Sequence, residues 1–437
     1  MNARRLLALL SSATLGAAIV GTPTPVQAHS TIYVGPGGGS GACKTPGAPY
    51  LTDGSADNVQ IQNAVDSAAS GDTINLCPGR YDITGEVNLG SKSLIIQGAG
   101  RERTQLDAKE RDTRFFYAGN ATITFKGLTM QNAHQSGYVG AIWGEGATNI
   151  IIQSSSFLNN YALDGMGVVF SRNGNISVVD STFEHNYSDT EGDVYYGGGA
   201  INATGDSDPV TVTIRNSTFI NNYSVGDGGA ILSRGSLNIT DSVFLNNESE
   251  SNGGALAVYG DLRLTRSRFS GNITHDEGAS SYVEGCTSLV ATNNRFTDNH
   301  AVGFGSDGGA FNLDCDEEAS ILINKNTFSD NMADDAGAVL DEDNGSVVIL
   351  TNNQIIGNYS GVASNLPEGG GAIWANRIRM TRNVFVRNTT AGCGGAVYIS
   401  TTDYGSSRQN FFGSNKGEIG APDTYNVCFG SDVYGVD

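Results

Sequence analysis

Two acidic and two aromatic residues recur at matching offsets in successive repeats of this chain, where side chains of these types could act on a carbohydrate. Counted from the alanine that follows the glycine of each repeat, Asp314 and Glu342 both lie four residues on. Trp374 and Tyr398 lie two residues on in the next two repeats. Because side chains alternate along a strand, these offsets predict that all four share one face of adjacent coils.

Two carboxylates about 5 Å apart beside an aromatic platform are the arrangement of a retaining glycosidase. The pattern therefore predicts Asp314 and Glu342 as catalytic residues and Trp374 and Tyr398 as ligand-binding residues. A glycan-binding strip without catalysis remains the alternative. Both interpretations depend on the assumed register, since a slip of one residue moves a side chain to the opposite face.

Acidic residues also recur just before the glycines of the repeats. They are Asp164, Asp193, Asp227, Glu250, Glu277, Asp307, Asp335 and Glu368. If these loops stack in register, neighbouring carboxylates repel one another and oxygen-rich loops suit Ca²⁺. Calcium is therefore the one cofactor that the sequence predicts, with Asp164, Asp193, Asp227, Asp307, Asp335 and Glu368 as ligands. The alternative is that loops of unequal length separate the acids in solvent, where salt screens them.

A repeat of two motifs predicts the elements that must position these residues. The first is Phe-x-x-Asn, which begins at Phe157, Phe183, Phe219, Phe244, Phe269, Phe296, Phe328, Phe385 and Phe412, with Ile355 in the one gap. The second is Gly-Gly-Ala followed by an apolar residue, as in Gly228-Gly229-Ala230-Ile231. Successive Phe positions lie about 25 to 36 residues apart, a period typical of solenoids.

Short runs of β-type residues with alternating polarity lie between these motifs, as at residues 210–214, 237–240 and 347–350. Such strands cannot bury their apolar sides alone, so we expect each strand to pair with its equivalent in the coils above and below. The phenylalanines should stack inside the coil. The asparagines should occupy left-handed corners and bond the next asparagine, and the double glycines should allow tight entry into a strand.

The chain opens differently. Residues 59–69 have helical spacing, an Asp57/Gln60 pair that resembles a capping box, and Gly71 as a stop. We therefore expect an N-terminal helix that covers the apolar core exposed at the end of the solenoid. The expected organisation is a signal peptide over 1–28, an N-terminal extension over 29–56 and the coil domain over 57–437.

Two known families share these patterns. Phe-x-x-Asn alternating with Gly-Gly-Ala-Ile resembles the repeats of polymorphic outer-membrane proteins. The opening IQNAVDSAASGDTINLCPGRYDI, followed by SLIIQGAG, resembles the first turns of pectate-lyase-like right-handed parallel β-helices. The resemblance implies an all-β fold: a single-stranded right-handed parallel β-helix of roughly 11–13 coils with an N-terminal capping helix.

The resemblance leaves the function open between classes, because this fold carries adhesins, surface fibres and enzymes. Polygalacturonase motifs are matched only in part, by Asp334-Asp335 and Arg377-Ile378-Arg379. The Gly-His-Gly of those enzymes is missing from the sequence. The first interpretation is a non-catalytic, adhesin-like protein that binds extracellular surfaces, glycans or partners. The alternative is a polysaccharide lyase or glycoside hydrolase, and a purely structural coat protein is a third.

Composition and targeting agree with a secreted protein. Arg4-Arg5, an apolar stretch and Val26-Gln27-Ala28 are typical of a secretory signal. Without that segment the remaining 23 basic and 45 acidic residues give a net charge of −22, which disfavours nucleic acid as a partner. No later segment is long and apolar enough to predict a membrane span. We therefore expect a location outside the cell or on its surface, with an extracellular polysaccharide or a cell-surface molecule as partner.

Six cysteines in an exported chain favour disulfides. Neighbouring pairs are about one repeat apart: Cys43 with Cys77, Cys286 with Cys315, and Cys393 with Cys428. Each of these pairs could join adjacent coils, although six cysteines allow 15 pairings in all.

Overall fold

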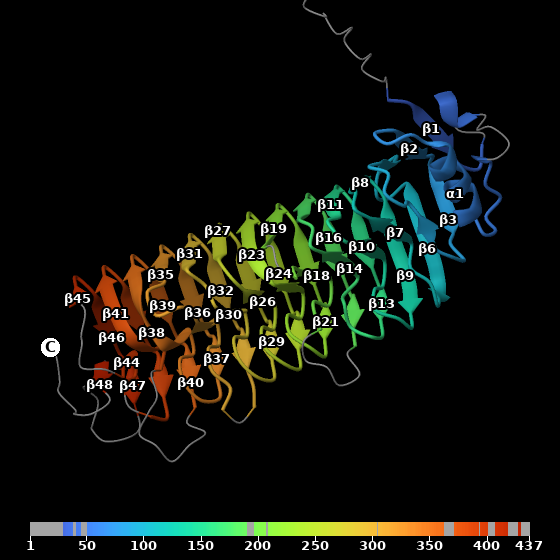
Figure 1. Ribbon diagram of the computed structural model, residues 1–437. Coiled ribbons are helices and arrows are strands. Elements are labelled where there is room, and N and C mark those ends of the chain that lie inside the picture. The colour runs from blue at the N-terminus through green and yellow to red at the C-terminus, as the bar shows by residue number, and fades with distance from the viewer. Residues whose placement is uncertain are drawn as a thin grey trace, which may run out of the picture.

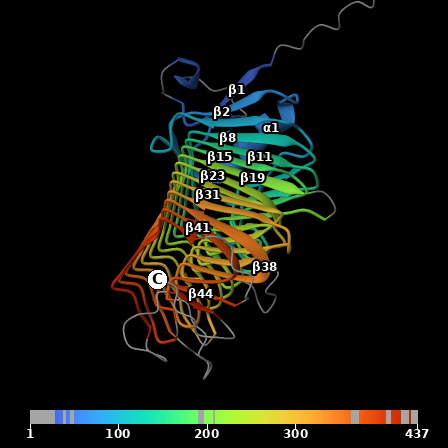
Figure 2. The ribbon, with the colours of Figure 1, turned by 90° about the vertical axis from the view of Figure 1, so that its left-hand side faces the viewer.

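The computed structural model describes residues 29–37, 41–44, 50–189, 196–206, 209–303, 305–361, 371–392, 394–400, 407–417 and 427–429. Figure 1 shows short strands stacked turn upon turn into an elongated solenoid, and Figure 2 shows the turns superposed when viewed from the C-terminal end. The chain makes about 12 turns of a right-handed parallel β-helix. The predicted fold class is confirmed. The expected signal peptide lies outside the described residues.

One turn illustrates how the sequence builds the fold. It contains β22 (Ile231–Ser233), β23 (Gly235–Thr240), β24 (Val243–Leu245) and β25 (Glu248–Ser249). These strands pair in parallel with their equivalents in the next turn, β26 (Leu256–Tyr259), β27 (Leu262–Thr265), β28 (Arg268–Ser270) and β29 (Ile273–Thr274). Alternation of buried and exposed positions along each strand sends one set of side chains into the core and the other outward.

The predicted phenylalanine column forms the axis of the core. Phe219, Phe244 and Phe269 are fully buried, and their ring centroids lie 4.8 and 4.7 Å apart with nearly parallel planes. The same stacking relates Phe157 to Phe183 at 4.7 Å. Stacked rings therefore run from Phe157 to Phe328, and Ile355 interrupts the column before Phe385, so the prediction is confirmed.

The asparagine ladder is confirmed, but its backbone conformation is not the predicted one. The Asn247 amide donates to Asn272 Oδ1 (3.0 Å) and to the carbonyl of Phe219 (3.1 Å), and the pattern recurs from turn to turn. The left-handed residue is the one before it, Asn246, with φ +50°. The ladder residue keeps ordinary backbone because the preceding position makes the corner, so its amide is free to bridge the turns.

A second polar ladder was not predicted. It runs through serines and asparagines at the corner after the second strand of each turn, all buried except the half-buried Asn410: Ser155, Ser181, Ser217, Ser242, Ser267, Asn294, Asn326, Asn353, Asn383 and Asn410. Each accepts the backbone N–H of its equivalent in the preceding turn. The change from serine to asparagine along the column conceals it in the sequence.

The glycine pairs behave as predicted. Gly253 has φ +73°, and a Cβ placed there would lie 2.2 Å from the carbonyl oxygen of Leu256. A Cβ on Gly254 would lie 2.4 Å from the carbonyl oxygens of Ala279 and Ile273. Both positions need glycine, because backbone rather than a flexible side chain occupies the space.

The N-terminal helix is confirmed as α1 (Asn58–Ser67), which buries Ile61, Ala64 and Val65 against the first turn. The capping box is wrong: the Asp57 carboxylate accepts the backbone N–H groups of Asp53, Gly54 and Asp82 instead. Strand β1 (Thr31–Val34) pairs in parallel with β2 (Thr73–Leu76). Sheet pairing therefore begins inside the segment that the sequence assigned to an N-terminal extension.

Candidate functional site

A cleft opens on the outer face of the first strands of the early turns. These strands are β7 (Phe116–Gly119), β10 (Ile142–Glu145) and β14 (Val169–Arg172), and their register places Tyr117, Trp143 and Phe170 one above the other. The Trp143 ring meets the other two edge to face, at centroid distances of 6.1 and 6.4 Å. The sheet therefore holds an aromatic cluster that faces outward rather than into the core.

The cleft has a volume of about 420 Å³ and combines an aromatic wall with charged groups. Its apolar lining is Trp143, Met166, Phe170 and Tyr196, and its charged lining is Glu145, Arg172, Asp206 and Arg234. Clefts of this size, mainly apolar and with a few convergent polar groups, are typical of ligand sites.

The charged side chains of the cleft hold one another in place. Arg172 makes ion pairs with Asp206 at 3.1 Å and with Glu145 at 3.7 Å. Hydrogen bonds from Asn173 and Arg172 lower the pKa of Asp206, so this carboxylate stays ionised at neutral pH. The guanidinium of Arg114 lies 4.5 Å from the Trp143 ring centroid, on the ring face. Fixed donors and acceptors thus surround an aromatic surface.

The same sheet carries tyrosines bonded to acids in the turns that follow the cleft. The Tyr259 hydroxyl donates to Asp227 at 2.5 Å, and the Tyr282 hydroxyl donates to Glu284 at 3.1 Å. Arg234 lies 4.6 Å from the Tyr259 ring centroid. Burial, and then the negative charge of these partners, raises the pKa of both tyrosines well above the usual range. Both hydroxyls therefore remain protonated donors at neutral pH.

These shifts predict a loss of stability at alkaline pH. The tyrosine pKa is raised in the folded state, so the stabilisation is complete below the unfolded pKa of about 10 and declines as pH rises above it. For Tyr161, on another face, the folded pKa is about 12, raised mainly by burial, which sets a window from about 10 to 12. We expect the melting temperature, followed by circular dichroism, to fall across that window. The melting temperature of a Tyr259→Phe variant should fall less over this range than that of the unmodified protein. An equal fall would contradict the assignment of the effect to Tyr259.

The predicted pairing of Asp314 with Glu342 is wrong. Strand β34 (Phe311–Asp314) pairs with β38 (Leu340–Thr351) so that Leu313, not Asp314, is opposite Glu342. Asp314 faces outward next to Glu284 of β30 (Ser281–Glu284), whereas Glu342 is fully buried in the core column. The error arises at Ala338, which occupies the position of the second glycine, so counting from this alanine shifts the register by one residue.

Glu342 has a structural task at its buried position. The register of β38 against β41 (Ile373–Thr381) shifts between Glu342 and Val347, and Glu342 Oε1 accepts the Ser346 N–H at 2.8 Å across this bulge. Glu342→Ala is expected to lower the free energy of unfolding by about 1–3 kcal/mol, because a buried donor loses its acceptor. Glu342→Gln keeps an acceptor and should cost less. Urea denaturation of the two variants checks this, and equal losses would refute it.

Trp374 and Tyr398 lie together as predicted. They are opposite each other in β41 and β44 (Val397–Ile399), with ring centroids 6.1 Å apart and planes 14° from parallel. Their outward column is the one that holds Trp143, but many turns separate the two groups (Figure 1). Tyr398 is only 4% exposed. Their ligand-binding role stays a prediction.

The acids before the glycines do not form the continuous column that the sequence predicted. Asp227, Glu277 and Asp307 occupy equivalent positions, since the backbone carbonyl of each accepts an N–H from the positive-φ glycine of the preceding turn. Asn252 interrupts the series between Asp227 and Glu277. Asp335 precedes that position by one residue and Asp164 by two, while Asp193 and Glu368 lie outside the described residues. Ser251 and Tyr259 donate to the Asp227 carboxylate. Calcium binding thus loses its continuous column and stays a prediction.

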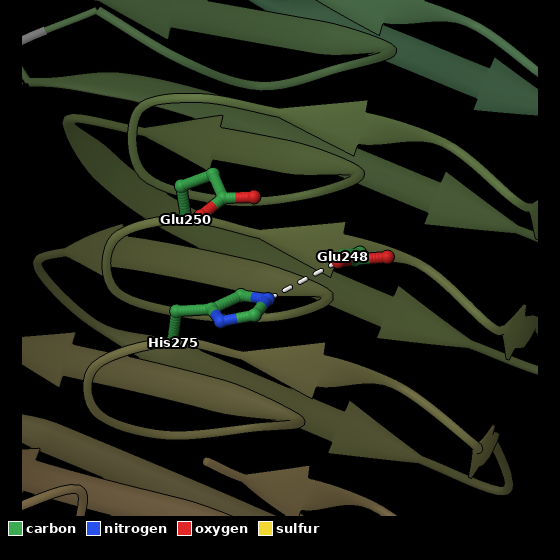
Figure 3. Close-up of side chains that lie close together, drawn as sticks. All are labelled: Glu248, Glu250 and His275. Atoms are coloured by element: carbon green, nitrogen blue, oxygen red, sulfur yellow. Dashed lines mark hydrogen bonds and ion pairs between the residues drawn. The ribbon is translucent and has the colours of Figure 1, made fainter. Parts of the chain in front are cut away.

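One group of metal-ligating side chains was missed. Glu248, Glu250 and His275 lie on the outer face of adjacent turns, and one ligand atom from each lies within 4.8 Å of the others (Figure 3). The available sequence signal was two glutamates two residues apart, followed one repeat later by a histidine.

Two of the three predicted disulfides are confirmed. Cys43 bonds Cys77, and Cys286 bonds Cys315. Cys393 lies outside the described residues, so its pairing with Cys428 stays a prediction. Within the parts of the chain that the structure describes, no helix is long and apolar enough to cross a membrane.

Comparison with known proteins agrees with the fold. Residues 199–383 match the family model of the right handed beta helix region. The fold of the chain is therefore that of the right-handed parallel β-helix proteins. The curated proteins contain no match.

Several solved structures are similar to the chain. PfbA, a surface adhesin of Streptococcus pneumoniae, is 16% identical with a TM-score of 0.45, over 84% of this chain and 91% of PfbA. A PL6 alginate lyase is 11% identical with a TM-score of 0.42, over 90% of this chain and 89% of the lyase. The A-module of a mannuronan C-5 epimerase from Azotobacter vinelandii is 14% identical with a TM-score of 0.35, over 86% of this chain and 96% of the module. At these values the likeness does not distinguish one function from another.

Proposed function

We propose that this protein binds an extracellular glycan in the cleft around Trp143 and does not cleave it. The observation that carries the proposal is the aromatic cluster of Tyr117, Trp143 and Phe170, placed beside fixed Arg–carboxylate pairs. Sugar rings have apolar faces that pack on aromatic rings, and their hydroxyls need donors and acceptors in fixed positions. Arg172 with Asp206, and Arg234 beyond them, supply both kinds of group at the rim of the same cleft.

The chemistry of the cleft favours binding over elimination. A lyase needs a base that is deprotonated near its working pH. The cations among the described lining residues are arginines, which stay protonated. The nearby tyrosines have their pKa raised by burial and by neighbouring carboxylates. Both kinds of group bind ligands as donors but are poorly suited to remove a proton.

A glycoside hydrolase is the second candidate, and one observation favours it. Glu284 and Asp314 are opposite each other on adjacent strands and both face outward. Adjacent strands lie about 4.8 Å apart, close to the carboxyl separation of retaining glycosidases. The pair that the sequence proposed as Asp314 with Glu342 is thus replaced by Asp314 with Glu284.

An extracellular location is part of the proposal. Two disulfides support it, because such bonds persist in oxidising compartments. A surface of strong negative charge supports a carbohydrate partner rather than nucleic acid.

Binding and cleavage are separated by one experiment. The full chain is tested on immobilised neutral and acidic polysaccharides while reducing ends and unsaturated sugars are measured in the supernatant. The expected result is retention on at least one polysaccharide with no product. Product that disappears in a Glu284→Gln, Asp314→Asn double variant would establish the hydrolase instead. Retention on none of the polysaccharides would refute glycan binding.

A further inference from the structure

Two glutamates and a histidine converge on the outer surface, on a face distinct from the cleft. Glu248 belongs to β25 and Glu250 follows it, and two residues apart on extended chain they point to the same side. His275 follows β29 in the next turn at the position equivalent to Glu250, because His275 N–H bonds Ser249 and Glu250 N–H bonds Ser224. Stacking of turns thus brings three potential ligands together from two strands.

The distances suit a small coordination sphere. His275 Nε2 lies 3.1 Å from Glu248 Oε1, and an oxygen of Glu250 completes a set within 4.8 Å. Metal bonds of about 2.0–2.2 Å in a tetrahedral site place ligand atoms roughly 3.3–3.6 Å apart. A side-chain rotation of the exposed Glu250 closes the remaining gap.

A neighbouring hydroxyl orients one of the ligands. The Tyr223 hydroxyl donates to Glu250 Oε1 at 2.7 Å, which leaves the second carboxylate oxygen for an ion. The Tyr223 ring is held by stacking on Tyr187, at a centroid distance of 4.9 Å. Groups in this outer position fix the orientation of metal ligands and raise affinity.

The charge and type of these ligands select the ion. Within the described residues, neither Glu248 nor Glu250 forms an ion pair with a lysine or arginine. Two carboxylates with a neutral imidazole carry a charge of about −2, which a divalent ion balances. Calcium prefers oxygen ligands only, whereas zinc and related ions accept imidazole nitrogen together with carboxylate oxygen.

We propose that Glu248, Glu250 and His275 bind a divalent transition-metal ion of the zinc class, with water in the remaining position. The ion links two successive turns on the outer face of the solenoid. This site is independent of the glycan cleft, and neither proposal depends on the other.

Calorimetric titration of the metal-free full chain with Zn²⁺ tests the proposal. We expect one ion per chain and an affinity that falls by about tenfold or more in His275→Ala. The matched control is His185→Ala, because His185 is an exposed histidine beside a single glutamate, Glu184, at 3.5 Å. This control should bind Zn²⁺ like the unmodified protein, and excess Ca²⁺ should not compete.

Electron paramagnetic resonance of bound Cu²⁺ gives a second readout that does not depend on affinity. The spectrum should contain the coupling of one imidazole nitrogen, and the coupling should vanish in His275→Ala. Absence of Zn²⁺ binding, equal binding by His275→Ala, or an equal loss in His185→Ala would overturn the proposal. Circular dichroism of the variants checks that they fold, and Glu250→Gln, which keeps the shape of the side chain, should also weaken binding.

Discussion

Replacing Phe244 by alanine is expected to lower the free energy of unfolding by about 3–5 kcal/mol. The ring is fully buried and lies between Phe219 and Phe269 at 4.8 and 4.7 Å. Its removal leaves a cavity in the middle of a column whose neighbours are held by the ladder of asparagines, so the turns cannot close over it. Stability in a solenoid depends on contacts between neighbouring repeats, which makes a central turn the most sensitive place.

Urea denaturation followed by circular dichroism measures this loss. The matched control is Phe411→Ala, which removes the same side chain from a position that is 59% exposed. We expect that control to change stability by no more than about 0.5 kcal/mol. A Phe244→Ala variant as stable as the control would contradict the description of the core.

Removing the indole of Trp143 is expected to weaken glycan binding by about 2 kcal/mol, or roughly 30-fold in Kd. Trp143 contacts Tyr117, Tyr138 and Phe170 and lies under the Arg114 guanidinium, so it is the centre of the cluster. Its ring is partly exposed to the cleft. A ligand that packs on the cluster therefore loses its main apolar contact in Trp143→Ala.

The variant Trp374→Ala serves as the comparison for this prediction. It removes an indole from the same outward column, many turns away, where the ring stacks on Tyr398. Sites that share no partner act independently, so we expect this change to leave the Kd within about threefold. Calorimetry with soluble oligosaccharides measures both variants. An equal loss in both would place the ligand along the whole column rather than in the cleft.

The architecture could be predicted because its determinants recur in every turn. Phe219 and Asn222 repeat at matching positions in the next turns, Phe244 with Asn247 and then Phe269. Any one occurrence would be ambiguous, but a repeated column of identical residues needs a stacked fold. The serine and asparagine ladder shows the limit of this reasoning, since Ser267 and Asn294 do the same task with different side chains.

The candidate site was harder to predict because it depends on register and on departures from the repeat. The residue count that paired Asp314 with Glu342 was wrong because a single alanine, Ala338, occupies the position of a glycine. The cleft around Trp143 lies in an early turn where one glycine, Gly140, precedes the alanine, so a search for glycine pairs passes over it. Loops of unequal length also displaced the acids that a uniform repeat would have aligned.

The most direct test of the central claim is to measure binding and cleavage of the same polysaccharide in one solution. The full chain is titrated with a polysaccharide that retains it, heat is recorded, and the mixture is then analysed for new chain ends. The account predicts saturable binding that Trp143→Ala weakens, with no increase in chain ends. New chain ends, or binding that is unchanged in Trp143→Ala, would contradict it.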